Sequence, residues 1–449
     1  MLAISVAGGV GSGFPPMDQQ ALTQLDLRHV WHPFTQQQGW SEEAPLMIER
    51  GEGVYVFDTV GRRYIDGTAS LWCNVHGHRH PAIDRAIHEQ VDRISHSTML
   101  GLSHPGATEL AGRLVEIAPP GLARVFYSDS GATAAEIALK IAFQYQQQRG
   151  ESGRTSFVRL RDAYHGDTIG SVSVGGIDLF HATYRPLLFE THAAEPGDVA
   201  DMERVLSERA GEVAAVIVEP LVQGAAGMIV HPPGYLRAVR ELCDEHELLL
   251  ICDEVATGFG RTGTMFACEQ EDVAPDLLCV AKGISAGYLP LAATLTSEAI
   301  YEGFLGAPAE QRTFFHGHTY TGNPLACAAA LASLDVFEDE RTIAAMQPKI
   351  RLLEQLLAEV EAMPEVAEVR WRGFLIGIDL GQHDPNLRLG HRVTLEARER
   401  GAIVRPLGDT LALVPPLAIS ETQLRELLSI TTNSIRAAVA SLPTPSPAT

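Results

Sequence analysis

The sequence predicts an α/β protein with a large domain, whose mostly parallel sheet is covered by helices, and a smaller α+β domain formed from both ends of the chain. Three observations predict it. A chain of 449 residues has room for roughly two or three domains and a large core. Between about residues 120 and 325, short apolar runs alternate with helical patterns, as in a parallel sheet covered on both faces. The two flanks lack this alternation.

The N-terminal flank is predicted to begin with a disordered segment, residues 1–20, and to continue as an antiparallel meander. The first residues lack the basic region of a secretory signal, and Met17 is an alternative to Met1 as the start of translation. Residues 45–66 contain short strand patterns joined by glycine turns. We therefore assign residues 21–70 to the small domain.

Residues 71–335 are predicted to form the large domain. One helix is expected from the spacing of Leu236, Val239 and Leu242, which places apolar side chains on one face. The expected strands are rich in aliphatic residues, and in chain order they are RVFYSD, SFVRLRD, VAAVIVEP, LLLICDE, LLCVAK and LAATLT.

The C-terminal flank, residues 336–441, is predicted to complete the small domain. It begins with a long helix, RTIAAMQPKIRLLEQLLAEVEAM. Strands are expected near residues 366–380 and 402–414, followed by a final helix from about residue 420. The last residues, 442–449, are rich in proline, serine and threonine, and we expect them to be disordered.

Composition narrows the class of protein. The formal net charge of −22 argues against a nucleic-acid partner and against an anionic membrane surface. No window approaches the roughly 18 apolar residues of a membrane span, so we expect a cytoplasmic protein with no membrane partner. Its 6 cysteines form no C-x-x-C pair, which favours reduced, mostly buried thiols over disulfides or a zinc site.

Polar groups follow the first predicted strand of the large domain. The strand FYSD leads into a Ser-Gly turn and a helix, where the backbone amides near Ser130, Gly131 and Ala132 would form an anion site suited to phosphate. The pattern Thr133-x-x-Glu136 predicts the cap of this helix. An ordinary, well-capped turn explains the same residues equally well.

Further functional groups follow later strands. Tyr164 and His165 come after SFVRLRDA, where an aromatic ring can face a flat ligand or simply pack. Asp253 ends a run that resembles the acidic strand of P-loop ATPases, but the chain has no G-x-x-x-x-G-K-[ST] motif. Lys282 lies among small and apolar residues, where burial would make its amine a nucleophile and a base. A snorkelling or ion-paired lysine is the alternative.

Two histidine clusters raise the possibility of a metal-dependent hydrolase. They contain His76, His78 and His80 in one loop, and His316 and His318 in another. A metal site would need further ligands at a strand end, and both clusters are interrupted by glycine. We therefore expect loop histidines that bond to the backbone, and no metal.

Taken together, the strand-end groups match the needs of a phosphorylated pyridine aldehyde. Such a cofactor requires a phosphate cradle, an aromatic side chain that faces its ring, a carboxylate near the pyridine nitrogen and an amine that condenses with the aldehyde. The chain supplies these groups in that order, at the Ser130 turn, Tyr164, Asp253 and Lys282. Pyridoxal 5′-phosphate is therefore the expected cofactor.

Longer stretches of the chain resemble a known family. The class III aminotransferases, which are pyridoxal-phosphate enzymes of fold type I, have segments similar to VEPLVQGAAGM, LLLICDEVATGFGRTG, DLLCVAKGISAGYLPLAAT and FFHGHTYTGNPLACAAAL, and the likeness extends from about residue 26 to 440. Segments such as HVWHPFTQ, GTASLWCNVHGHRHP and IVRPLGD most resemble the members that aminate 8-amino-7-oxononanoate in biotin synthesis. The resemblance implies ping-pong transfer from an amino donor to a keto acid, in a homodimer with active sites at the interface.

The resemblance also implies a role for each site residue. Lys282 would bind the cofactor covalently and move the proton, Asp253 would pair with the pyridine nitrogen, and Arg405 would bind the substrate carboxylate. The cofactor site would comprise Ser130, Gly131, Ala132, Tyr164, His165, Glu219, Asp253, Lys282, His318 and Thr319, with His318 and Thr319 contributed across the dimer interface. The substrate site would comprise Phe34, Leu71, Trp72, Tyr164, Lys282, Gly317 and Arg405.

Two positions depart from the members that use S-adenosylmethionine as the amino donor. Those members typically have a tyrosine where this chain has Phe34 and a tryptophan where it has Leu71, so the donor is open between S-adenosylmethionine and lysine. Two other functions remain open. One is a class III aminotransferase for diamines or ω-amino acids, and the other is a catalytically idle fold that serves as a binding module, against which the intact Lys282 and Asp253 count.

Overall fold

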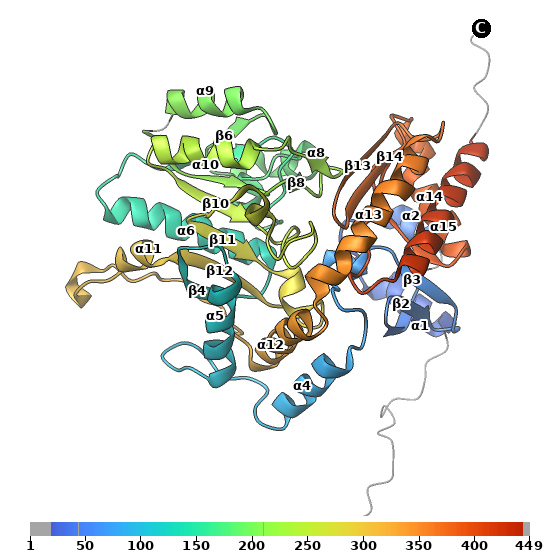
Figure 1. Ribbon diagram of the computed structural model, residues 1–449, viewed down its shortest axis with the longest axis horizontal. Coiled ribbons are helices and arrows are strands. Elements are labelled where there is room, and N and C mark those ends of the chain that lie inside the picture. The colour runs from blue at the N-terminus through green and yellow to red at the C-terminus, as the bar shows by residue number, and fades with distance from the viewer. Residues whose placement is uncertain (1–18, 44, 210, 443–449) are drawn as a thin grey trace, which may run out of the picture.

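The computed structural model describes residues 19–43, 45–209 and 211–442 (Figure 1). Helix α1 (Gln19–His29) begins inside the segment 1–20 that we expected to be disordered, so regular structure starts before residue 21. The rest of that segment, which includes Met17, and residues 443–449 lie outside the described residues. None of the helices in the described ranges combines the length and apolarity that a membrane span requires.

The large domain is built on one seven-stranded sheet with the order β4-β12-β11-β10-β7-β5-β6. Neighbouring strands are parallel except at β12, which is antiparallel to both of its neighbours, so the prediction of a mostly parallel sheet is confirmed. The sequence patterns predict all of these strands except β6. Their bounds are β4 (Leu122–Ser128), β5 (Ser156–Leu160), β6 (Thr191–Ala194), β7 (Val213–Val218), β10 (Leu249–Asp253), β11 (Leu277–Val280) and β12 (Ala292–Ser297).

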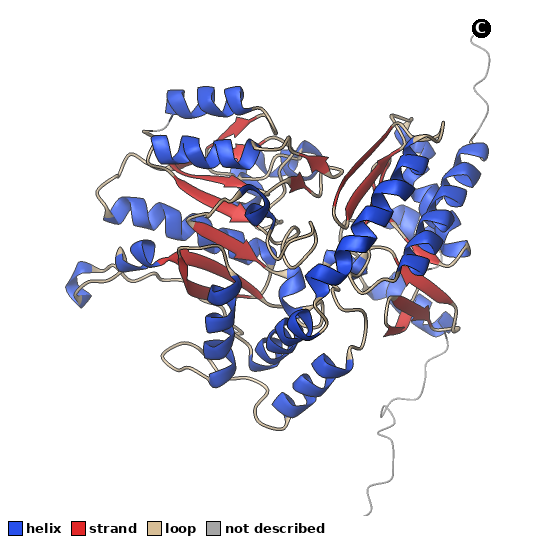
Figure 2. Cartoon of the chain, in the orientation of Figure 1, coloured by secondary structure: helices blue, strands red, loops and turns tan. Residues whose placement is uncertain are grey.

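Both faces of this sheet are buried, because successive side chains of a strand point to opposite sides. In β10, Ile251 belongs to the core beneath helix α6 (Gly131–Gln148), whereas Leu250 and Cys252 belong to the larger core on the other face. Figure 2 shows helices on both sides of the strands. The other long helices of this domain are α4 (Pro81–Val91), α5 (Pro105–Ile117), α9 (Val199–Arg209), α10 (Tyr235–Glu245) and α12 (Pro324–Asp339).

The small domain combines both ends of the chain, as predicted. Strand β15 (Ala402–Ile403) pairs in parallel with β3 (Arg63–Asp66), which joins the C-terminal residues to the predicted antiparallel meander. That sheet is completed by β1 (Ile48–Glu52) and β2 (Tyr55–Asp58). A second sheet has the order β13 (Glu368–Arg372), β14 (Leu375–Asp379), β17 (Thr410–Leu413) and β16 (Arg405–Leu407). The helices are α13 (Thr342–Glu361), α14 (Leu389–Glu399), which the sequence patterns do not indicate, and α15 (Glu421–Ala440).

Shorter elements connect these parts. Helix α12 continues across residue 335, the expected domain boundary, so the chain passes that point without a break in the helix. The remaining elements include α2 (Gln37–Glu42), α3 (Ala69–Trp72), α7 (Ile169–Ser173), α8 (Asp178–His181), β8 (Val222–Gln223), β9 (Ile229–Val230) and α11 (Glu298–Glu302).

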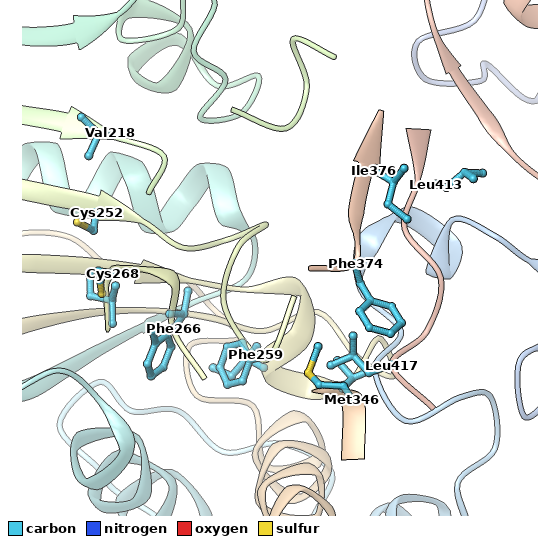
Figure 3. Close-up of a cluster of buried hydrophobic side chains, with 14 of the residues drawn as sticks. Val218, Cys252, Phe259, Phe266, Cys268, Met346, Phe374, Ile376, Leu413 and Leu417 are labelled. Atoms are coloured by element: carbon cyan, nitrogen blue, oxygen red, sulfur yellow. The ribbon is translucent and has the colours of Figure 1, made fainter. Parts of the chain in front are cut away.

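One hydrophobic core spans the two domains. Figure 3 shows it extending from Cys252 in the sheet, through Phe259, to Phe374 and Leu417 in the small domain. All four side chains are almost fully buried. The shared core therefore holds the small domain against the carboxyl ends of the parallel strands, which is where ligands bind in open α/β sheets.

Candidate active site

A cavity of about 700 Å³ lies at the carboxyl ends of the parallel strands. It is lined by residues that follow β4, β5, β7, β10 and β11, although these strands are far apart in sequence. The predicted site residues that line it are Leu71, Trp72, Ser130, Gly131, Ala132, Tyr164, His165, Glu219, Asp253 and Lys282. The cavity also has lining residues that sequence reasoning missed, among them Cys73, Asp129 and Tyr288. Asp129 follows β4 directly, and that position was the signal that could have identified it.

Lys282 follows strand β11 at a strained position, with a φ of 45°. Its ammonium has no hydrogen-bond or ion-pair partner among the described residues, and its Nζ lies 5.0 Å from the centre of the Trp72 ring. Burial lowers the pKa of Lys282 and Arg261 adds to this effect, whereas Asp253 and Glu219 oppose it. The environment therefore favours a neutral, unengaged amine that can act as a nucleophile and a base.

The other two lysines are engaged. The Nζ of Lys140 lies 2.9 Å from Nδ1 of His316. Lys349 donates from its Nζ to the carbonyl oxygen of Leu417 at 2.6 Å. Neither lines the cavity. Lys282 is thus the one lysine of the three that lies in the cavity with its amine unpaired.

Asp253 is held at the end of β10 by two donors. The backbone N–H of Val255 donates to its Oδ1 at 3.0 Å, and Nδ1 of His165 lies 2.7 Å from its Oδ2. The His165 side chain is fully buried, and its Nε2 has no partner among the described residues. His165 thus fixes the Asp253 carboxyl group through Nδ1. The pair places this carboxyl group in the lining of the cavity.

The start of helix α6 lines the cavity, but its cap differs from the prediction. The N-cap is Ser130, whose hydroxyl accepts from the backbone of Thr133, and not the expected pair of Thr133 and Glu136. Glu136 instead accepts from Thr168 Oγ1 at 2.5 Å and from the backbone N–H of Gly170 at 2.8 Å. The sequence motif alone could not show that Glu136 faces a neighbouring loop.

The free amides of the α6 start are those of Gly131 and Ala132. The N–H of Ser130 donates to Thr133 Oγ1 at 3.0 Å, so it is already engaged. The N–H groups of the next two residues have no acceptor in the described part of the chain, and they point from the positive end of the helix dipole. A Cβ added at Gly131 would come within 2.5 Å of Val255 Cγ1. Glycine therefore allows the start of α6 to pack closely against Val255, which also lines the cavity.

Tyr164 and Glu219 form another part of the cavity wall. The backbone N–H of Tyr164 donates to Glu219 Oε1 at 3.0 Å, and Gly224 N–H donates to Glu219 Oε2 at 3.0 Å. The phenol donates to Asp167 Oδ2 at 2.7 Å, and burial raises the pKa of Tyr164, which stays neutral. Burial also raises the pKa of Glu219 to about 7. Glu219 therefore fixes the backbone that presents the Tyr164 ring.

The residues present fit pyridoxal phosphate. The unpaired amine of Lys282, the buried carboxylate of Asp253, and the free amides of Gly131 and Ala132 are the three polar features such a cofactor requires. Without a ligand, a partly buried amine and two partly buried amides lose hydrogen bonds to water and gain none from the protein. These unsatisfied groups mark the place of a bound group.

Three predicted substrate residues, Arg405, Phe34 and Gly317, lie outside the lining of the cavity. Arg405 is on β16, half-buried, and its guanidinium has no ion pair or hydrogen bond among the described residues. Burial lowers the pKa of Arg405, and the nearby Tyr164 opposes this shift. Phe34 lies edge-on to Phe180, with ring centres 5.2 Å apart, and Phe180 lies 6.3 Å from Tyr164. Tyr164 thus links the first two of these residues to the cavity: it interacts electrostatically with Arg405, and its ring contacts Phe180, which contacts Phe34.

Gly317, His318 and Thr319 do not line the cavity of their own chain. They belong to the segment between α11 and α12, where Nδ1 of His318 lies 3.3 Å from Oδ2 of Asp129. Thr319 is exposed. Their expected contribution across a dimer interface stays a prediction.

In the first histidine cluster each side chain has its own partner. His76 bonds to Ser333, while His78 lies 2.9 Å from Asp66 and His80 lies 3.1 Å from Glu340, so the expected bond to the backbone is confirmed only for His76. In the second cluster Nε2 of His316 lies 3.1 Å from Nε2 of His318. Within the described ranges, no group of three or more His, Cys, Asp and Glu residues is arranged to hold a metal ion. The cysteines are free thiols, and all but Cys73 are buried, as the sequence predicts.

Comparisons with known proteins agree with this geometry. The aminotransferase class-III family matches residues 37–435. The adenosylmethionine-8-amino-7-oxononanoate aminotransferase of Nitratidesulfovibrio vulgaris is 56% identical over 91% of this chain and 80% of its own length. The crystal structure of the enzyme of that name from Methanocaldococcus jannaschii superposes with a TM-score of 0.92 at 44% identity, covering 94% of this chain and 99% of that one. A thermostable (S)-enantioselective omega-transaminase from Thermomicrobium roseum superposes with a TM-score of 0.90 at 34% identity, covering 95% of this chain and 100% of that one.

Proposed function

The chain belongs to the class III aminotransferases, and on that premise we propose that it transfers an amino group to 8-amino-7-oxononanoate, giving 7,8-diaminononanoate for biotin synthesis. The single observation that carries the choice of acceptor is Arg405, a half-buried guanidinium without a partner among the described residues, close to Tyr164 at the cavity. It suits a substrate whose reacting end enters the cavity while a distant carboxylate stays at the rim. The names of the relatives support the same acceptor.

Lys282 and Asp253 carry the chemistry. Pyridoxal phosphate, when bound, supplies an aldehyde that condenses with amines and a protonated ring that withdraws electrons from the adjacent carbon. Lys282 would hold that aldehyde until a donor amine takes its place. Its freed Nζ would then accept the proton from the donor carbon and deliver it to the carbon of the former aldehyde, a role that its lowered pKa favours. Asp253 would keep the ring nitrogen protonated.

The remaining residues bind and orient. The amides of Gly131 and Ala132 would hold the phosphate at the start of α6. Tyr164 would pack against the ring, and Glu219 fixes the Tyr164 backbone. The same cavity serves both half-reactions in turn, so the kinetics are ping-pong.

The proposal also concerns the identity of the amino donor. The relatives are named for adenosylmethionine, which makes it the first candidate. Lysine is the second, because the rim offers Phe34 and Leu71, which have neither a phenol nor an indole to contact a sulfonium or an adenine ring. Leu71 is 50% exposed at the cavity, so its side chain is available to either donor.

A second copy of the chain completes the site in this proposal. Its Gly317, His318 and Thr319 would approach the phosphate of the first copy, and the exposure of Thr319 supports this role. Phe315 and Tyr320 beside them are large and exposed, as side chains of an interface are in a single copy. The free cysteines support the proposed cytoplasmic location, where thiols stay reduced.

A spectral titration tests the function. Purified enzyme with bound cofactor is mixed with S-adenosylmethionine or with lysine, and conversion of the cofactor to its amine form is followed by absorbance. 8-Amino-7-oxononanoate should then reverse the change, and an analogue without its carboxylate should do so poorly. Arg405→Met should abolish that discrimination, while Arg400→Met, at the exposed end of α14, should retain it. Equal activity with simple ω-keto acceptors would instead favour the omega-transaminase function.

A further inference from the structure

Residues 312–319, which we call the 312–319 segment, lie between α11 and α12 and have two faces. Exposure alternates along them, because Phe314, His316 and His318 are half-buried whereas the residues between them are exposed. A period of two is typical of an extended chain that packs through one side only. Phe315, on the outer side, is 80% exposed. The inner face therefore holds the segment to its own domain, and the outer face is open to another molecule.

One stripe of helix α6 holds the start of this segment. Lys140, Gln144 and Gln148 are four residues apart, so their side chains lie on the same side of the helix. Gln148 donates from its Nε2 to the carbonyl oxygen of Arg312 at 3.1 Å, and Gln144 donates to that of Thr313 at 3.2 Å. The 312–319 segment is thus bound to α6 from its first residues.

Four polar residues continue these contacts to the start of α6. The Nζ of Lys140 lies 2.9 Å from Nδ1 of His316, and Nε2 of His316 lies 3.1 Å from Nε2 of His318. Nδ1 of His318 in turn lies 3.3 Å from Oδ2 of Asp129, which precedes the N-cap of α6 and lines the cavity. We call these four residues the histidine chain. It ends beside the amides that the proposed function assigns to the phosphate.

The order of donors in the histidine chain follows from Lys140. A lysine ammonium can only donate, so Nδ1 of His316 accepts. Burial lowers the pKa of His316, and Lys140 and His318 add to this effect, which favours a neutral ring. A neutral ring that accepts at Nδ1 carries its hydrogen on Nε2, and that hydrogen points to His318. Lys140 thus orients His316, and His316 orients His318.

The outer face of the segment ends in unpaired donors. Thr319 is exposed, and neither its hydroxyl nor its backbone N–H has a partner among the described residues. It directly follows His318, whose side chain is turned to Asp129 of the same copy. Hydroxyl and backbone N–H groups are suited to bind phosphate oxygens. His318 is therefore the anchor, and Thr319 is the residue of this pair that a second copy can use.

We propose that the histidine chain is a positioning device: it fixes the 312–319 segment on its own α6, so that Thr319 is held in place for the cofactor phosphate of a second copy. This inference rests on the proposed function, in which a second copy completes the site. His318 would act through Thr319 and not by a contact of its own. Lys140, at the surface of one copy, would thereby control how firmly the other copy holds its cofactor.

Cofactor affinity of Lys140 variants gives the first test. The purified holoenzyme is depleted of cofactor and titrated with pyridoxal phosphate in equilibrium dialysis. Lys140→Met removes the donor and keeps the length of the side chain, and we expect affinity to fall on the order of tenfold. Lys140→Arg can still donate to His316 and should stay within about twofold of the wild type. Unchanged affinity in Lys140→Met would overturn the proposal.

Lys349→Met is the matched control. It also removes a lysine that donates a hydrogen bond, in this case to the carbonyl oxygen of Leu417, and it lies outside the lining of the cavity. We expect it to bind pyridoxal phosphate as the wild type does. An equal loss of affinity in Lys349→Met would show that any lost lysine bond weakens the site, and the proposal would fail.

Hybrid dimers show in which copy the chain acts. Lys282→Ala removes the amine that borohydride traps, so trapping at increasing pyridoxal phosphate reports only the site that keeps Lys282. When one copy carries Lys282→Ala and the other Lys140→Met, the reporting site receives an intact segment from its partner, and we expect wild-type affinity. When one copy carries both changes and the other is wild type, the reporting site receives the altered segment, and affinity should fall on the order of tenfold.

The opposite pattern in the two hybrids would overturn the proposal, because the chain would then act on the amides of its own α6. A protein that is a monomer would overturn it as well. If Lys140→Met does not fold, His316→Phe replaces it in both hybrids, since it keeps a ring against Phe314 and removes both nitrogens. Trapping needs no acceptor. An enzyme that ignores 8-amino-7-oxononanoate would therefore refute the proposed function, and the hybrids would still decide the role of the histidine chain.

Discussion

Asp253 and Glu254 are adjacent carboxylates at the end of β10, and both are almost fully buried. Glu254 points into the loop formed by residues 254–268, where three donors from the same chain satisfy it. Asp253 points into the cavity, beside an unpaired lysine and the free amides of α6. The contrast extends to the cations, because Arg261 bonds to two carbonyls while Lys282 bonds to nothing among the described residues. Closed networks hold a fold together, whereas buried polar groups left unpaired indicate where a ligand binds.

The largest expected effect comes from removing the unpaired amine. Lys282→Ala should lower turnover by about 10⁴-fold or more, because no other group near the cavity can bind the aldehyde and move the proton. The fold should survive, since the Lys282 ammonium has no bond to lose. Lys349→Met, which removes a bonded lysine, should do the reverse and lower Tm with little loss of rate. Turnover and thermal melting of both variants check this pair.

The adjacent carboxylates provide the next test. Asp253→Asn removes the charge and keeps the size, and we expect about a 10³-fold loss of turnover with a small change in stability. Glu254→Gln should leave the turnover of folded enzyme nearly intact and cost about 2 kcal/mol of unfolding free energy, because a buried network loses an acceptor. Denaturant unfolding and steady-state rates separate the two. If Asp253→Asn and Glu254→Gln lost turnover and stability to the same extent, the two carboxylates would not have the different roles assigned to them.

A smaller effect is expected at the start of α6. Gly131→Ala places a methyl group where only 2.5 Å separates the added Cβ from Val255 Cγ1, so one of them must move. We expect cofactor affinity to fall about tenfold, since overpacking costs about 1–3 kcal/mol. Gly112→Ala, in α5 with open space around the added Cβ, is the control and should bind cofactor normally. Equilibrium dialysis of pyridoxal phosphate measures both.

The last effect is on the pH dependence of stability and leaves the chemistry of the site aside. Burial raises the pKa of Glu219 from 4.5 to about 7, so between these values the folded chain keeps a proton that the unfolded chain releases. The stability from this group is present below pH 4.5 and is lost as pH rises toward 7, by up to about 1.4 kcal/mol per pH unit. Glu219→Gln should flatten the slope of unfolding free energy between pH 5 and 7, and Glu302→Gln, at an exposed position, should not. An unchanged slope in Glu219→Gln would show that this carboxyl is ionised throughout.

The same contrast explains what the sequence could predict. The sheet was predictable because strands buried on both faces, such as β7 and β10, are nearly all apolar. The groups of the cavity were predictable because Asp253 and Lys282 directly follow such strands, and the carboxyl ends of parallel strands meet at one edge. At Asp253 and Lys282, the position that the sequence pattern predicts is also the position in the folded chain.

Other features depend on contacts that no local pattern records. The antiparallel direction of β12 follows from its neighbours in the sheet, not from its composition. Thr133 and Glu136 fit a capping motif, yet Ser130 is the cap because Glu136 bonds to residues more than 30 positions away. The place of Arg405 came from the resemblance alone, since an arginine on a short strand has no signal of its own. The contacts of Arg261 with Asn74 and Pro415 are equally remote in sequence.

Reductive trapping tests the central claim most directly, namely that the unpaired amine of Lys282 binds the cofactor. The purified enzyme is treated with borohydride, digested and mapped by mass spectrometry. We expect the reduced pyridoxyl group on the peptide that contains Lys282, with Lys140 and Lys349 unmodified. A group found on either of those two lysines, or on none, would contradict the account.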